Sequence, residues 1–87
     1  MASTISDVKS QLDEAFRRTD DVSGRLSAAL VTLEEAQALV LAATDGSNNR
    51  AIEQMTSALV EVREGIEEIM TTLSAAVKEA QEYSAGL

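Results

Sequence analysis

Hydrophobic residues recur along this chain with a strict seven-residue period, which restricts the fold more than any other feature. From Ile5 they advance by alternating steps of three and four residues, and Thr19 is the one polar residue in the first series. This pattern is typical of a coiled-coil seam, in which positions a and d of each heptad contact a second helix. The first series is Ile5, Val8, Leu12, Ala15, Thr19, Val22, Leu26, Ala29, Leu33, Ala36, Val40 and Ala43.

The repeat stops near the middle of the chain and then resumes. Four residues between the two series, Asp45, Gly46, Ser47 and Asn48, form the predicted turn, where Gly46 can adopt the left-handed conformation that closes a helix. Ser47, Asn48 or Asn49 can then cap the second helix. The second series is Ile52, Met55, Leu59, Val62, Ile66, Ile69, Leu73, Ala76, Ala80, Tyr83 and Leu87.

Two similar repeats on either side of a turn predict an all-α fold, an antiparallel two-helix hairpin of the coiled-coil type. We expect a single domain over residues 1–87, with one helix at about 4–44, the turn at about 45–48 and the second helix at about 49–84. Ser3, Thr4 or Ser6 can cap the first helix. Because every a position then meets a d position, Leu33 is expected opposite Val62.

Several hydrophobic residues lie outside the predicted a and d seam. These residues are Phe16, Leu30, Met70 and Val77 at e positions and Leu39 at a g position. A hydrophobic stripe of this width is typical of a bundle helix. These five residues are therefore the predicted partner interface. The partner is either a second copy, giving a homodimeric four-helix bundle, or another helical-hairpin protein.

The composition removes most catalytic chemistry. The 87 residues include no cysteine and no histidine, so thiolate ligands and the commonest general base are both lacking. Glu61, Glu64, Glu67 and Glu68 form the densest acidic cluster, and their b, c and f positions predict a solvated face and not a di-iron site. We expect no enzyme activity, no catalytic residue, no cofactor and no bound metal.

The charge and hydropathy pattern restricts partners and location. A net charge of −8 repels phosphate backbones and anionic headgroups, so we expect no nucleic-acid partner. The longest wholly hydrophobic run, residues 38–43, is far shorter than the ~20 residues that span a bilayer, so no membrane insertion is expected. The first residues lack the pattern of a cleavable signal peptide. The expected location is the cytoplasm, or outside the cell by a signal-peptide-independent route.

An acidic, cysteine-free chain of this length with a glycine in its central turn resembles a known group. It is similar to the small Trp-x-Gly, or ESAT-like, helical-hairpin proteins that type VII secretion exports from actinobacteria. Gly46 stands near the family's motif glycine, and Tyr83 stands where the tyrosine of the export motif is found. The tryptophan is absent, and Leu87 occupies the position of the acidic residue that ends the export motif.

The resemblance implies a small non-enzymatic protein that accompanies or chaperones a secreted helical protein. The alternative, from a different class, is a structural coiled-coil module that assembles with itself to scaffold or oligomerise a larger complex. Arg18 and Arg25 at g positions fit either function, and Arg18 is expected to pair with Glu79 across the hairpin.

Overall fold

Two long helices account for nearly all of the protein that the structure describes. The structure is a computed structural model and describes residues 4–43 and 49–87. Helix α1 covers Ile5–Ala43 and helix α2 covers Arg50–Ala85. Each helix has the length that its heptad series predicts, and both Gly24 and Gly65 are helical. The predicted turn at Asp45, Gly46, Ser47 and Asn48 lies outside the described residues.

The start of each helix is fixed by a capping side chain. The Asp7 backbone N–H donates to Thr4 Oγ1 at 3.1 Å, and the Thr4 backbone N–H donates to the Asp7 carboxylate at 3.3 Å. This reciprocal pair is a capping box that uses Asp in place of Glu. At α2, Asn49 Oδ1 accepts from the Ala51 N–H at 2.8 Å. Among the alternatives that the sequence left open, Thr4 and Asn49 are therefore the two caps.

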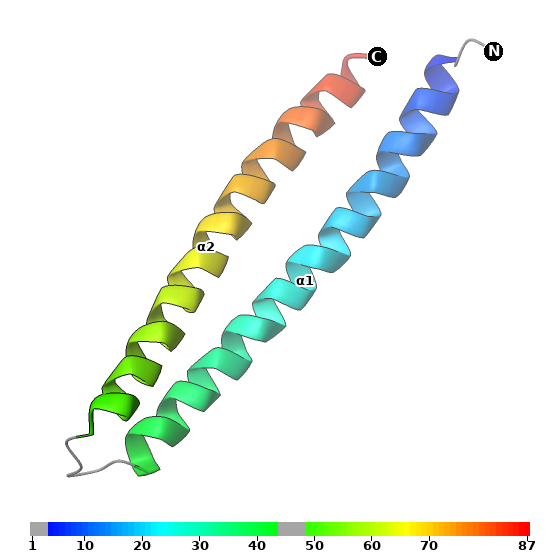
Figure 1. Cartoon of the computed structure of the whole chain (residues 1–87). Coiled ribbons are helices and arrows are strands. Elements are labelled where there is room, and N and C mark those ends of the chain that lie inside the picture. The colour runs from blue at the N-terminus through cyan, green and yellow to red at the C-terminus, as the bar shows by residue number, and fades with distance from the viewer. Residues whose placement is uncertain (1–3, 44–48) are drawn as a thin grey trace.

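The two helices run antiparallel and contact each other along their length. Figure 1 shows the start of α1 and the end of α2 at one end of the molecule, and the end of α1 and the start of α2 at the other. The molecule is a rod of 65 × 21 × 15 Å, so it is long and only two helices wide. The all-α helical hairpin that the sequence predicts is confirmed.

The contact between α1 and α2 follows heptad positions a and e, whereas the sequence predicted a and d. Partly covered residues recur at a and e in both helices, although a few neighbours such as Ala29 and Ala36 are also partly covered. In α1 the a and e residues are Leu12, Phe16, Thr19, Ser23, Leu26, Leu30, Leu33, Gln37 and Val40. In α2 they are Ile52, Thr56, Leu59, Arg63, Ile66, Met70, Leu73, Val77, Ala80 and Ser84.

This difference corresponds to a rotation of each helix by about 50° about its own axis. Both position pairs alternate steps of three and four, so the period alone cannot distinguish them. The predicted seam contact between Leu33 and Val62 is wrong. Leu33 is partly covered and lies in the seam, whereas half of Val62 is exposed. The d residues of α2 consequently face away from α1.

Two further expectations concern polar side chains. Thr19, the one polar seam residue of α1, donates its hydroxyl to the Ala15 carbonyl at 2.8 Å, so its own helix satisfies it. The predicted pairing of Arg18 with Glu79 is replaced by a shorter-range one, because Arg18 Nε lies 3.1 Å from Glu14 Oε1. Because Glu14 lies one helical turn away on the same helix, Arg18 can contact it without extending across the seam. Among residues 4–43 and 49–87, every ion pair joins two residues of the same helix.

The hairpin has no closed core. Among residues 4–43 and 49–87, no side chain is buried, and even the seam residues are only partly covered. A pair of helices can cover only one stripe of each, so this result follows from the architecture. The chain is nevertheless 45% hydrophobic, and much of that hydrophobic surface remains in contact with water.

Candidate partner-binding face

Large hydrophobic residues gather at the d positions that the hairpin leaves uncovered. Half of Val62 is exposed, as are 56% of Ile69 and 62% of Tyr83. Val22 and Met55, also at d, are exposed to a similar degree. We call the surface formed by the d and g positions of both helices the apolar face.

The d positions of α1 and α2 lie on the same side of the hairpin. In an antiparallel pair that uses the same positions for its contact, the same letters flank that contact on each side. Positions d and g therefore border one side of the a and e seam in both helices, and b borders the other. Small residues occupy the g positions of α2 beside the large d residues, namely Ala51, Ala58, Gly65 and Thr72.

The opposite side of the hairpin, which we call the polar face, carries a groove between the helices. Phe16, Thr19 and Ser23 from α1 and Met70 and Val77 from α2 line it and are partly covered. The other lining residues are exposed and polar, namely Arg17, Asp20, Ser74, Lys78 and Gln81. Because this one groove is lined from both helices, it also shows directly that the e positions of α1 and α2 face each other.

The predicted partner-interface residues divide into two groups. Phe16, Leu30, Met70 and Val77 are partly covered and belong to the seam within the hairpin. Leu39, at a g position, is 71% exposed and lies on the apolar face. Whether any of them contacts a partner stays a prediction. The d residues Val62 and Ile69, which the sequence assigned to the internal seam, are the exposed ones that sequence reasoning missed.

A shallow groove on α2 lies within the apolar face. It is lined by three larger residues, Glu68, Ile69 and Leu73, and by three smaller ones, Gly65, Thr72 and Ala76. A Cβ atom built on Gly65 would meet no atom within 4 Å. The space above Gly65 is therefore open to an approaching backbone, as a helix–helix contact of small residues requires.

The acidic cluster lies in water, as predicted. Glu61, Glu64, Glu67 and Glu68 are all exposed. Within residues 4–43 and 49–87, no group of three or more Asp or Glu side chains is placed to hold a metal ion.

Arg63 is the charged residue closest to the seam, with 34% of its side chain exposed. Its Nε has no hydrogen-bond partner among the described residues, and the Glu67 carboxylate lies at the 4.0 Å limit for an ion pair. We regard that contact as weak, because both the distance and the missing hydrogen bond indicate that the Arg63 stem packs in the seam while its charge is held only loosely.

Helix α1 is more hydrophobic over its length than the short run at residues 38–43 suggests. By length and composition alone it is apolar enough to cross a membrane, and none of the qualifying stretch is buried within the structure. Residues 26–43 hold only two charged side chains, Glu34 and Glu35. A helix that is hydrophobic around much of its circumference can equally be the inner helix of a larger bundle.

Comparison with known proteins gives no relative. No family model, no curated protein and no solved structure matches this chain.

Proposed function

We propose that this protein is a non-enzymatic interaction module whose apolar face binds another helical protein. The observation that supports it is the exposed stripe of Val62, Ile69 and Tyr83 on a hairpin that buries none of its described residues. A hydrophobic stripe of this kind, rimmed by polar residues, is typical of a protein–protein contact site. Two hairpins joined through such faces form a four-helix bundle, in which both faces leave the water.

The biological part of the proposal is based on the resemblance to the ESAT-like proteins of type VII secretion. In this proposal the hairpin accompanies or chaperones a secreted helical protein, and the two proteins are exported or stored as a complex. The alternative function is a self-assembling scaffold, which the same face supports if its partner is always another copy.

Co-expression with the helical proteins encoded beside it tests the proposal. We expect a stable one-to-one complex, measured by native mass spectrometry of the copurified pair. Ile69→Glu should abolish the complex, because it places a carboxylate in the apolar contact. Ser74→Glu, on the rim of the polar face, adds the same charge to the same helix and should leave the complex intact.

The outcome separates the two functions. A complex with a neighbouring protein that Ile69→Glu abolishes supports the partner function. A homodimer that is indifferent to those proteins favours the scaffold. A hairpin that stays monomeric alone and with every neighbour contradicts both, since the apolar face would then bind nothing.

A further inference from the structure

The accessible surface of this hairpin is too large for a chain of its size. It exposes 6658 Å² at 9.2 kDa, whereas a compact monomer of that mass exposes about 4,900 Å², so the excess is about 1,700 Å². Permanent dimers bury about 1,000–2,500 Å² on each partner. The surplus surface of one hairpin therefore matches what one further hairpin of similar size would cover.

The side-chain sizes on the apolar face are complementary between the two helices. Every d residue of α1 is Ala or Val, whereas those of α2 include Met55, Ile69 and Tyr83. The d residues of α1 are therefore the smaller set and those of α2 the larger one.

From these observations we infer that a second copy of this chain covers the apolar face, with the turns of both hairpins at the same end. In this orientation α1 of one copy lies over α2 of the other, and both contacts are identical because a two-fold axis runs along the rod. The larger d residues of α2 in one copy, among them Met55, Ile69 and Tyr83, then pack against the row of Ala and Val at the d positions of α1 in the other copy.

The reversed orientation fits the side chains less well. It places α1 over α1 and α2 over α2, so the d residues of α1, which are only Ala and Val, face each other on one side, while those of α2, among them Met55, Ile69 and Tyr83, face each other on the other. One side of the bundle would then need a shorter interhelical distance than the other. Alternating large and small residues across the contact, as in the orientation with both turns together, keeps the two distances equal.

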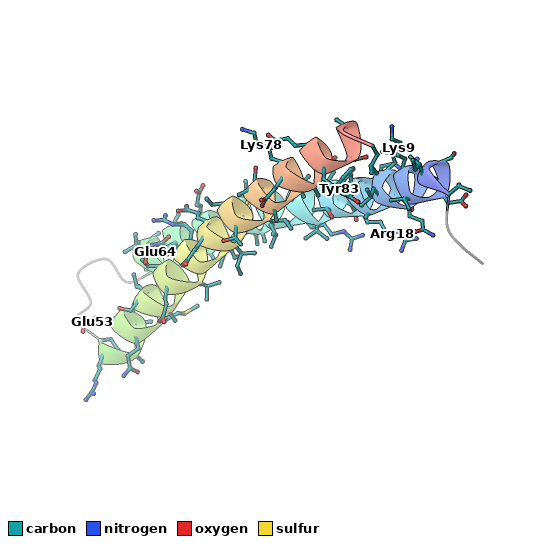
Figure 2. The ribbon with its side chains drawn as sticks, turned by 90° about the horizontal axis from the view of Figure 1, so that it is seen from above. Lys9, Arg18, Glu53, Glu64, Lys78 and Tyr83 are labelled. Carbon is teal, nitrogen blue, oxygen red and sulfur yellow. The ribbon has the colours of Figure 1, made fainter. Side chains whose placement is uncertain are left out.

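The distribution of charge alone favours the reversed orientation, so the strength of the electrostatic effect must be compared with that of the packing. Residues 26–69 hold eight acidic and two basic side chains, whereas the rest of the chain holds seven acidic and five basic ones. Figure 2 shows Lys9, Arg18 and Lys78 towards the end with the termini and Glu53 near the opposite end. The described charges of residues 26–69 stand at b, c, e and f positions and none at d or g. Exposed charges are screened over about 8 Å at physiological salt, so the packing of the d residues dominates.

A membrane is a poorer occupant of the same face. Interfacial helices place Lys and Arg along the border of their apolar side, where they meet anionic headgroups. Here Arg18 and Arg25 occupy g positions of α1, but α2 carries Glu79 at a g position and Glu61 and Glu68 at the adjacent c positions. The total charge of −8 adds to the repulsion.

Spin labels test the orientation in the full-length chain, which has no native cysteine. Glu53→Cys lies near the turn end and Glu64→Cys lies near the middle of α2, and both side chains are exposed. If both turns lie at the same end, the distance between the two labels in the Glu53→Cys dimer should agree with that in the Glu64→Cys dimer to within about 10 Å. In the reversed dimer the two Glu53 labels are about 44 Å apart along the rod, and the Glu64 labels are about 10 Å apart.

This inference and the proposed function both rest on the apolar face as the contact surface. Apart from that, either can be wrong while the other holds. Sedimentation velocity of the unlabelled chain should give a dimer. A monomer, or Glu53 labels more than about 20 Å further apart than Glu64 labels, overturns the inference. If that monomer or reversed dimer still forms a one-to-one complex with a neighbouring protein, the proposed function stands without it.

Discussion

The two faces of the hairpin differ in how their hydrophobic residues are used. On the polar face, Phe16, Met70 and Val77 line a groove between α1 and α2 and are covered in part by their own chain. On the apolar face, Val62 and Ile69 point away from the other helix, and at least half of each is exposed. The hairpin therefore partly covers one stripe of each helix internally and leaves the neighbouring stripe exposed.

This comparison explains why the composition exceeds the needs of a hairpin. A two-stranded coil requires two hydrophobic positions in seven, whereas a bundle helix requires three or four. Here a and d carry mostly hydrophobic residues and e adds four more, Phe16, Leu30, Met70 and Val77, although only two of the three positions can face the other helix. The d residues of α2 are the ones left exposed.

The largest expected effect comes from breaking the seam. Leu30→Glu combined with Met70→Glu places two carboxylates at partly covered e positions, which should lower the free energy of unfolding by about 2–4 kcal/mol. Helicity by circular dichroism at 25 °C should fall together with the melting temperature. The control is Val31→Glu with Thr71→Glu, one residue further along at exposed f positions. Equal loss in both variants would contradict the a and e seam.

Next in size is the effect of charging the apolar face. Val62→Glu with Ile69→Glu should convert the assembled protein to single hairpins, because each carboxylate would lose its hydration in the contact. The molar mass from light scattering reports this directly. Ser57→Glu with Ser74→Glu adds the same charge to α2 at positions f and b and should leave the mass unchanged. A mass that stays the same in the first variant means that the apolar face has been wrongly assigned.

A matched glycine pair sharpens the comparison further. Gly24→Gln and Gly65→Gln both relieve the helix of a glycine, which stabilises an isolated helix by up to about 1 kcal/mol. A Cβ at either position meets no atom within 4 Å. Only Gly65 lies in the groove of the apolar face, so only its substitution should weaken association, by about tenfold in Kd. Concentration-dependent sedimentation measures both variants, and similar Kd values for the two would count against close packing at Gly65.

The smallest expected effect is a loss of helix stability that involves neither face. Asn49→Ala removes the side chain that accepts from the Ala51 N–H, and this should cost about 1 kcal/mol of stability. The melting temperature should fall while the molar mass at high concentration stays the same, because neither face loses a contact. Asn49→Asp keeps an acceptor oxygen and should restore the melting temperature. A change of mass in Asn49→Ala would link the cap to the partner contact.

The local chemistry of the sequence was sufficient to predict both helices and their starts. The reciprocal bonds of Thr4 and Asp7 involve neighbouring residues, as does the bond from Ala51 to Asn49, so short-range geometry determines them. The exposure of Glu61 and Glu64 was predictable for a similar reason, because a charged residue on the outer face of a helix stays hydrated. These features do not depend on how the two helices meet.

The seven-residue period of the sequence by itself determined that two helices of this length fold back on each other. Only the tertiary structure decided that Phe16 and Met70 lie in the seam while Val62 and Ile69 lie outside it. The physical reason is that stripes a–d and a–e have the same period and differ by a rotation of about 50°. Which rotation is adopted depends on how all the side chains of one helix fit against the other, a property that no single residue or spacing contains.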